Sequence, residues 1–440
     1  QQAAGPGHPP IGSRPVVPGD HNGDGKVTPA DVQFHLQRNL LGYIYEYLHR
    51  CMPYFDGDFI MYEMTALAAL AATLGNEEIT REVLESDVGL RVLLTNSWFR
   101  DGKFIYDSTG YNLGNAQTPL QIAEWLHGGP CRGKSLDLYN DPDYRMSALF
   151  DFIRHVDCDG RVPQIGDVGG SRSRSLRETP AYSTYDERAL LRLPSRRDIY
   201  LRRLLTASGG NLEGLRESAA DAWLVFHAGA PLTPPASGPT KPEVPASHIF
   251  DDGGIAILRA GGTAATRLHV PMTFSKGQYA HGHPDKLAIN LFRYGYDLSA
   301  DLGYPTTWTD IKNGGWETNT ASHCTVMVDE RGQQGYVIGN LHFFAAEPLC
   351  DVVEASAEQA YPQCSLYRRT VGVVRDERGE PLYVVDFFRV AGGKTRDYHF
   401  HSLGKPEDLT VTSAGVSPAQ GGVAGEAPAL AWVKQERGTL

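Results

Sequence analysis

Several features that would narrow the function of a 440-residue chain are scarce or missing from this sequence. No apolar run approaches the ~18 residues that a membrane-spanning helix needs, and the first residues, QQAAGPGHPP, have neither the basic start nor the apolar segment of a signal peptide. The six cysteines are too sparse for a disulfide scaffold, and none forms a CxxC pair, so a zinc ribbon is not predicted either. The net charge is −11, which is atypical of a nucleic-acid-binding protein. We therefore expect neither a membrane nor a nucleic acid as a partner.

The composition is that of a soluble globular protein. Hydrophobic residues make up 41% and charged residues 21% of the chain, enough for real cores, and the length predicts two or three domains. Arginines nevertheless gather between residues 172 and 203. They indicate either a solvated helix face or a local basic surface for a polyanion, and the sequence leaves both open.

Two proline-rich stretches divide the chain. Residues 1–19 hold nine Pro or Gly and read as a tail, and residues 231–245 hold six Pro and read as a linker. Between them, FIMYEMTALAALAATLG (59–75), TPLQIAEWLHGG (118–129) and DYRMSALFDFIRHV (143–156) have amphipathic helical patterns, and a further helical run over 186–210 is interrupted at Pro194. We expect a tail over 1–19, a calcium loop over 20–31, a helical domain over 32–230, a linker over 231–245 and a strand-rich domain over 246–440.

After residue 246 the sequence consists of short β-branched or aromatic runs separated by Gly, Asp and Pro. Strands are expected in GGIAILRAGG, TRLHVPMTF, LAINLFRYGYDLS, HCTVMVDE, LYRRTVGVVRD and PLYVVDFFRVAGG. Helices first and strands afterwards predict separate α and β domains and not a βαβ sheet.

The segment DHNGDGKVTPAD (20–31) fits the twelve-position calcium loop and is similar to dockerin-type loops. Its ligands would be Asp20, Asn22, Asp24, the carbonyl of Lys26, Thr28 and Asp31. The last position is usually Glu, and no second copy of the loop is present. The alternative is a polar turn that caps a helix starting near Pro29.

Two histidines in HGHPDKL, His281 and His283, are followed by Asp301 in SADLGYP and by His323 in NTASHCTVMVD. On a strand, the spacing of two would place His281 and His283 on the same face. Two histidines and a carboxylate are a common zinc-binding set, although fifteen histidines produce chance pairs.

HGHPDKL, ADLGYP and SHCTVMVD match, in order, the β-domain motifs of heparinase II/III-like polysaccharide lyases. This resemblance implies an incomplete α/α toroid followed by an antiparallel β-sandwich, because the helical region is short for a complete toroid. It also implies that His283, Asp301 and His323 bind zinc and that His281 projects into the catalytic cleft. Cys324 stands where the family commonly has Asn.

The helical half carries two further matches. RDGKFIYDSTGYNLGN resembles the family run that ends on the catalytic tyrosine, which would be Tyr111, with Asp107 in place of the usual Glu. DGRVPQIGD (159–167) resembles a P-x-I-G-D turn of the family. Without the resemblance, Tyr111 would be taken as a packing residue beside a glycine-rich loop.

One position departs from the family. The family neutralises the substrate carboxylate with an Asn, whereas Asp58 stands at that place. An ionised Asp58 would repel a uronate, so the neutralising residue is left unassigned. The candidate substrate-binding residues are Asp58, Asn112, Gln117 and Tyr304, with Asn115 as a further substitute.

The resemblance implies β-elimination from a uronic-acid polysaccharide, with Tyr111 as acid/base, His281 as its partner and a structural zinc. A zinc-dependent hydrolase that uses the same three ligands, and a non-catalytic protein that binds acidic glycans, are the alternatives. The implied location is secreted or periplasmic. The polysaccharide, whether a glycosaminoglycan or an alginate-type polymer, and the oligomeric state are not predicted.

Overall fold

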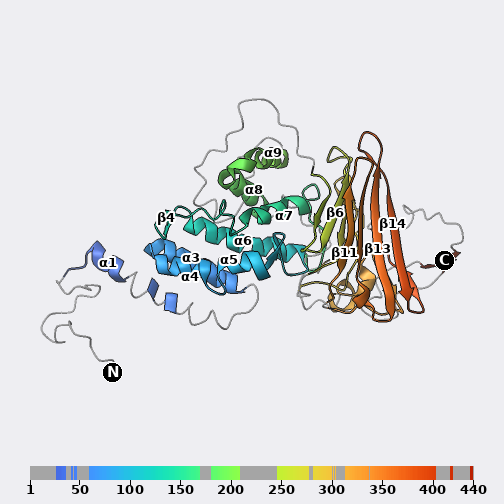
Figure 1. Cartoon of the computed structure of the whole chain (residues 1–440), viewed down its shortest axis with the longest axis horizontal. Helices are drawn as coiled ribbons and strands as arrows, with labels where there is room; N and C mark the ends of the chain where they lie inside the picture. The colour runs from blue at the N-terminus through green and yellow to red at the C-terminus, as the bar shows by residue number, and fades with distance from the viewer. Residues whose placement is uncertain are drawn as a thin grey trace, which may run out of the picture. The chain divides into compact units, whose positions relative to one another are not determined.

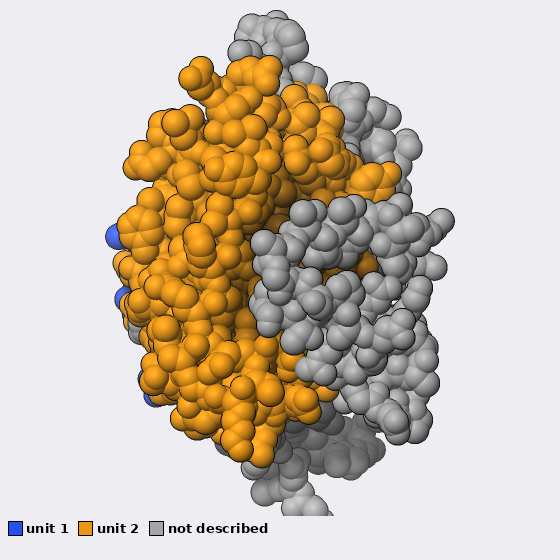
Figure 2. Space-filling view, turned by 90° about the vertical axis from the view of Figure 1, so that its right-hand side faces the viewer, with its two compact units in different colours: residues 1–90, 118–137 blue, residues 91–117, 138–440 orange. Residues whose placement is uncertain are grey.

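A computed structural model describes residues 26–35, 41–42, 44–46, 59–168, 180–208, 245–276, 281–299, 301, 303, 313–335, 337–402, 417–419 and 437–439. The chain separates into two compact units, one of residues 1–90 and 118–137 and the other of residues 91–117 and 138–440, which are coloured differently in Figure 2. All the contacts of the candidate site described below lie within the second unit.

The described helices fall almost entirely in the first half of the chain (Figure 1). They are α1 (Pro29–His35), α3 (Phe59–Leu74), α4 (Glu77–Glu85), α5 (Leu90–Val92), α6 (Thr109–Leu126), α7 (Met146–Val156), α8 (Pro180–Arg192) and α9 (Arg197–Ser208), with short helical segments η3 (Leu93–Ser97), η4 (Pro194–Arg196), η5 (Asn313–Glu317), η6 (Thr320–Ser322) and η7 (Glu358–Ala360). Among the described residues, none of these helices combines the length and apolarity needed to cross a membrane.

The helix predicted over 59–75 is confirmed as α3 in the first unit. Met64, Leu67 and Ala68 are buried along one side of it, as the helical spacing of its apolar residues requires. Gly75 follows the last helical residue, where a C-terminal cap was expected. The break predicted at Pro194 is confirmed too, because η4 separates α8 from α9.

Helix α6 begins earlier than the sequence indicated. The predicted helix started near Thr118, and Tyr111 was placed beside a glycine-rich loop, whereas α6 starts at Thr109 and includes Tyr111 in its first turn. Ser108 explains the early start, because its hydroxyl accepts a hydrogen bond from the Tyr111 backbone N–H at 3.2 Å and its carbonyl accepts one from the Asn112 N–H. A serine in this position caps a helix and offsets the low helix propensity of the glycines that follow.

The strands form short pairs and two larger antiparallel sheets. The larger sheets have the orders β5–β6–β7–β8–β9 and β11–β12–β13–β14. Their bounds are β5 (His248–Phe250), β6 (Ile255–Ala260), β7 (Leu268–Thr273), β8 (Phe292–Arg293), β9 (Tyr296–Asp297), β11 (Asn340–Ala346), β12 (Cys350–Ser356), β13 (Cys364–Arg375) and β14 (Pro381–Gly392). The pairs are β1 (Phe99–Arg100) with β2 (Lys103–Phe104), β3 (Pro130–Cys131) with β4 (Lys134–Ser135), β10 (Val326–Val328) with β15 (Arg396–Tyr398), and β16 (Ser417–Ala419) with β17 (Arg437–Thr439).

The two larger sheets pack into a sandwich, whose strands are seen side by side on the right of Figure 1. Leu258 and Val270 of the first sheet share one apolar core with Val353, Val371 and Val373 of the second. Along β13 the buried residues alternate with more exposed ones, which is the period of a strand with one face against a core. The predicted order of helices followed by antiparallel strands is therefore confirmed.

One predicted strand is shorter and more divided than expected. The run LAINLFRYGYDLS contains only an isolated bridge at Ile289 and the short hairpin β8–β9. Tyr294 and Gly295, between the two strands, have φ values of +57° and +76°, which form the tight turn that reverses the chain. The strands β11 and β12 were absent from the prediction.

Polar contacts fix the helical part of the second unit to its sheets. The Arg259 side chain on β6 donates hydrogen bonds to the backbone oxygens of His155 and Asp157 at the end of α7. In the loop between β1 and β2, Asp101 Oδ2 accepts from the backbone N–H of Asp252 at 2.7 Å. These contacts join α7 and the β1–β2 loop to the sheet residues of the second unit.

Candidate active site and metal centre

His281 and His283 do not lie on a strand, so that part of the prediction is wrong. They occupy a turn, and His281 has a φ of +57°. Its carbonyl accepts a hydrogen bond from the backbone N–H of Asp167 at 2.9 Å. The loop that ends at Asp167 is therefore hydrogen-bonded to the backbone at His281, as a neighbouring strand would be.

Tyr111 and His281, predicted to act together, are in direct contact. Their rings stack with centroids 3.7 Å apart and planes 16° apart. Tyr106 borders the pair, with its ring 5.1 Å from that of His281. Tyr111 on α6 and His281 in the turn before the β8–β9 hairpin are 170 positions apart in the sequence. They nevertheless belong to one aromatic cluster.

A single carboxylate binds both histidines of the HGH motif. Asp167 Oδ2 lies 3.0 Å from His281 Nδ1, and Asp167 Oδ1 lies 3.0 Å from His283 Nε2. Burial raises the pKa of Asp167, but the hydrogen bonds from the two histidines outweigh burial and bring the pKa below its ordinary value. Asp167 is therefore ionised at neutral pH and can only accept hydrogen bonds.

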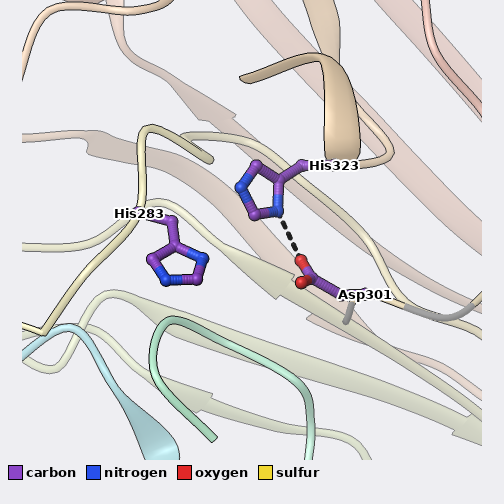
Figure 3. Close-up of side chains that lie close together, drawn as sticks. All are labelled: His283, Asp301 and His323. Carbon is purple, nitrogen blue, oxygen red and sulfur yellow. Dashed lines mark hydrogen bonds and ion pairs between the residues drawn. The ribbon is translucent and has the colours of Figure 1, made fainter. Parts of the chain in front are cut away.

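The residues predicted to bind zinc come together in the fold (Figure 3). One potential ligand atom from each of His283, Asp301 and His323 lies within 4.8 Å of the others. All three side chains are buried, and His323 Nδ1 is 2.5 Å from Asp301 Oδ2, the dashed contact in Figure 3. His283 Nδ1 and His323 Nε2 are buried without a hydrogen-bond partner.

This donor set fits a divalent cation. Two buried imidazole nitrogens without partners are costly unless something accepts their lone pairs, and imidazole with carboxylate suits zinc. Burial raises the pKa of Asp301, but the close contact with His323 outweighs burial and lowers the pKa overall. The ligating carboxylate is thus in the ionised form that a metal requires.

A second buried charged group lies beside this cluster. Lys103 Nζ is 3.5 Å from Asp107 Oδ1, and Lys286 Nζ is 3.5 Å from Asp107 Oδ2. All three residues are at most 3% exposed. Asp107 therefore links the segment before α6 to the HGHPDKL segment.

The predicted substrate-binding residues have different outcomes. Asn112 is 1% exposed, and neither of its side-chain amide atoms has a hydrogen-bond partner. Gln117 is half-buried farther along α6. Asp58 and Tyr304 lie outside the described residues.

Half of the predicted calcium loop lies outside the described residues, including Asp20, Asn22 and Asp24. In the other half, Asp31 Oδ2 accepts hydrogen bonds from the Thr28 backbone N–H at 2.9 Å and from the Thr28 hydroxyl at 2.6 Å. These contacts cap α1, which begins at Pro29 as expected. Calcium binding through Lys26, Thr28 and Asp31 stays a prediction.

Sequence reasoning missed Asp167 and Ser108 as site residues. The P-x-I-G-D turn was noted only as a resemblance, although its aspartate binds both histidines. Ser108 joins this turn to α6, because its hydroxyl donates to the Asp167 carbonyl at 2.8 Å. A carboxylate within a turn motif was the available signal, but its partners lie more than 110 positions away in the sequence.

Comparisons with known proteins concern the strand-rich domain and the fold. Residues 242–435 match the family model described as heparinase II/III-like, C-terminal. The structure is similar to that of heparinase III, with 17% identity, a TM-score of 0.54, and coverage of 77% of this chain and 47% of that chain. It is also similar to heparan sulfate lyase HepC from Pedobacter heparinus, with 15% identity, a TM-score of 0.57, and coverage of 83% and 50%. No curated protein matches the sequence.

The chain spans about half the length of these solved structures. At such identities the likeness concerns the fold, and it confirms the expected fold class of a helical toroid followed by an antiparallel β-sandwich. The family match confirms the resemblance read from the motifs of the strand-rich half, whereas the dockerin-like loop stays a prediction. Residues 242–435 of this chain are therefore similar to the heparinase II/III-like C-terminal domain.

Proposed function

We propose that this chain belongs to a polysaccharide lyase that cleaves an acidic, uronic-acid-containing polysaccharide by β-elimination. The observation that carries the proposal is the stacked contact of Tyr111 with His281, next to a buried cluster that fits a metal. The names of the similar structures, heparinase III and a heparan sulfate lyase, support an acidic polysaccharide as the substrate class. Glycosaminoglycans come first among the candidates, and alginate-type polymers second.

In such an elimination, a base removes the C5 proton of the uronate and an acid protonates the leaving O4. We assign the acid/base role to the hydroxyl of Tyr111, whose side chain is half-buried. When the C5 proton and O4 lie on the same face of the sugar, this one hydroxyl can serve both. His281 is assigned as its partner, because its ring lies directly against that of Tyr111. It positions the substrate or serves as the base for the opposite C5 epimer.

The substrate carboxylate must be neutralised before C5 becomes acidic enough. We propose Asn112 for this contact, because a buried amide without partners is unfavourable until a ligand satisfies it. Gln117, five positions along α6, is proposed as a further substrate contact. Asp58 and Tyr304 remain proposals from the sequence alone.

The bound metal is proposed to be zinc, held by His283, Asp301 and His323. Zinc would join the HGH turn to the segments that carry Asp301 and His323, and so hold the neighbouring His281 in place. A second, calcium-binding site at residues 20–31 and a secreted or periplasmic location are proposed as well. The family match begins at residue 242, which supports a domain boundary within the proline-rich stretch 231–245.

The test is the ultraviolet absorbance of 4,5-unsaturated uronate ends on a panel of acidic polysaccharides. Wild type is compared with Tyr111→Phe and with Tyr383→Phe, a matched control at a β14 position that is 57% exposed. We expect absorbance to grow with wild type and the control and to be lost with Tyr111→Phe, by about 10²–10⁴-fold for a missing acid/base group.

A parallel reducing-end assay separates the alternatives. New reducing ends without absorbance would refute elimination and favour a zinc-dependent hydrolase. Binding to the polysaccharides without either signal would instead indicate a glycan-binding protein.

A further inference from the structure

Asp167 links several parts of the candidate site. Both of its carboxylate oxygens bind histidines, at 3.0 Å each. Its backbone N–H donates to the His281 carbonyl at 2.9 Å, and its carbonyl accepts from the Ser108 hydroxyl, which caps the helix that carries Tyr111. The residue therefore contacts the proposed metal site, the proposed catalytic histidine and the base of α6 at once.

The two histidines use opposite nitrogens to reach this carboxylate. His281 faces Asp167 with Nδ1, whereas His283 faces it with Nε2. Because an ionised carboxylate only accepts hydrogen bonds, each of these nitrogens carries the proton. In the neutral ring, the nitrogen without a proton is consequently Nε2 in His281 and Nδ1 in His283. His283 Nδ1 is the buried atom without a hydrogen-bond partner beside Asp301 and His323.

The geometry points to Asp167 as a positioning residue that holds His281 and His283 in opposite tautomers, and so couples metal binding to the orientation of the catalytic histidine. This inference rests on the proposed function for the role of His281. It assigns the lone pair of His283 Nδ1 to the metal, and it places the proton of His281 on Nδ1. A carboxylate behind a histidine ligand is known to fix the ligand's tautomer and to strengthen metal binding.

The coupling follows from the shared group. If Asp167 shifts to follow a displaced His283, its other oxygen shifts with it and moves away from His281 Nδ1. Loss of the metal is therefore expected to loosen His281 although His281 is not a ligand. The metal affects the reaction through orientation of this chain's own side chains.

Asp167→Asn tests the inference because an amide has one accepting oxygen and one donating nitrogen. It can keep one histidine tautomer only by forcing the other histidine to accept a hydrogen bond. We expect zinc affinity, measured by competition with a chromophoric chelator, to fall about 10–100-fold. We also expect the ¹⁵N imidazole shifts of ¹⁵N-histidine-labelled protein to show one altered tautomer.

Asp159→Asn is the matched control. Asp159 lies in the same loop, is 12% exposed, and binds His269 Nε2 at 2.8 Å. Its replacement costs a buried contact of the same kind but leaves His281 and His283 untouched, so their tautomers and the zinc affinity are expected to stay unchanged. Asp167→Glu retains two accepting oxygens and is expected to keep both tautomers, and it serves if Asp167→Asn does not fold.

Unchanged zinc affinity and unchanged tautomers of His281 and His283 in Asp167→Asn would overturn the inference. Neither measurement requires substrate, so the result is independent of lyase activity. A wild-type protein without lyase activity, together with altered tautomers in Asp167→Asn, would refute the proposed function and keep the positioning role. Lyase activity in wild type, together with unchanged zinc affinity and unchanged tautomers in Asp167→Asn, would refute the positioning role and keep the proposed function.

Discussion

Gly166 gives the sharpest test of how the site is packed. Its φ is +64°, and a Cβ there would lie 2.2 Å from the Asp107 carbonyl oxygen and 2.4 Å from the His281 carbonyl oxygen. A left-handed backbone costs an alanine about 1–2 kcal/mol, and overpacking against atoms that cannot both retreat adds about 1–3 kcal/mol. We therefore expect Gly166→Ala to lower the free energy of unfolding by about 2–5 kcal/mol, measured by urea denaturation.

Gly379→Ala separates the two contributions. Gly379 has a φ of +83° in the same unit, and a Cβ there would meet nothing within 4 Å. Only the backbone cost applies, so about 1–2 kcal/mol is expected. Equal losses in the two variants would refute the argument that Asp107 and His281 close tightly around Gly166. Gly166→Ala is also expected to lose lyase activity, whereas Gly379→Ala keeps it.

Three further predictions concern charge and metal. Burial, with the nearby Arg154 charge, lowers the pKa of His155 to about 2. Because the unfolded histidine takes up a proton below about pH 6.5, stability should fall by about 1.4 kcal/mol per pH unit from there downward. Denaturation between about pH 7 and pH 5 should show a flatter slope in His155→Gln, and an unchanged slope would contradict this. Chelation should lower the melting temperature and zinc should restore it, by an amount equivalent to about 4 kcal/mol at a thousandfold excess over Kd. His323→Ala should abolish that response, and its persistence would place the metal elsewhere. Arg369→Met should cost about 3–5 kcal/mol because it leaves the Asp386 carboxylate without its buried partner, whereas Arg378→Met, at an 85% exposed side chain, should change stability by less than about 0.5 kcal/mol. Similar losses of stability in the two variants would contradict the burial of the Arg369–Asp386 pair.

The sequence determined the elements whose signal is local. The helix over 59–75, the break at Pro194 and the strands β6, β7, β13 and β14 follow from apolar periodicity and from Gly and Pro, which act within a few residues. Where local signals conflicted, the prediction was wrong. The glycines of α6 suggested a loop, but Ser108 caps a helix that tertiary contacts with residues 163–167 hold in place.

The sequence by itself also determined the metal-ligand candidates, because His283, Asp301 and His323 stand in motifs with a recognisable order. Only the tertiary structure decided what surrounds them. That Asp167 binds two histidines more than 110 positions away, that Tyr111 stacks on His281, and that Lys103 and Lys286 share Asp107 depend on how loops and helices close around one another. Such contacts leave no periodic pattern in the chain, since each depends on distances between segments that sequence spacing does not set.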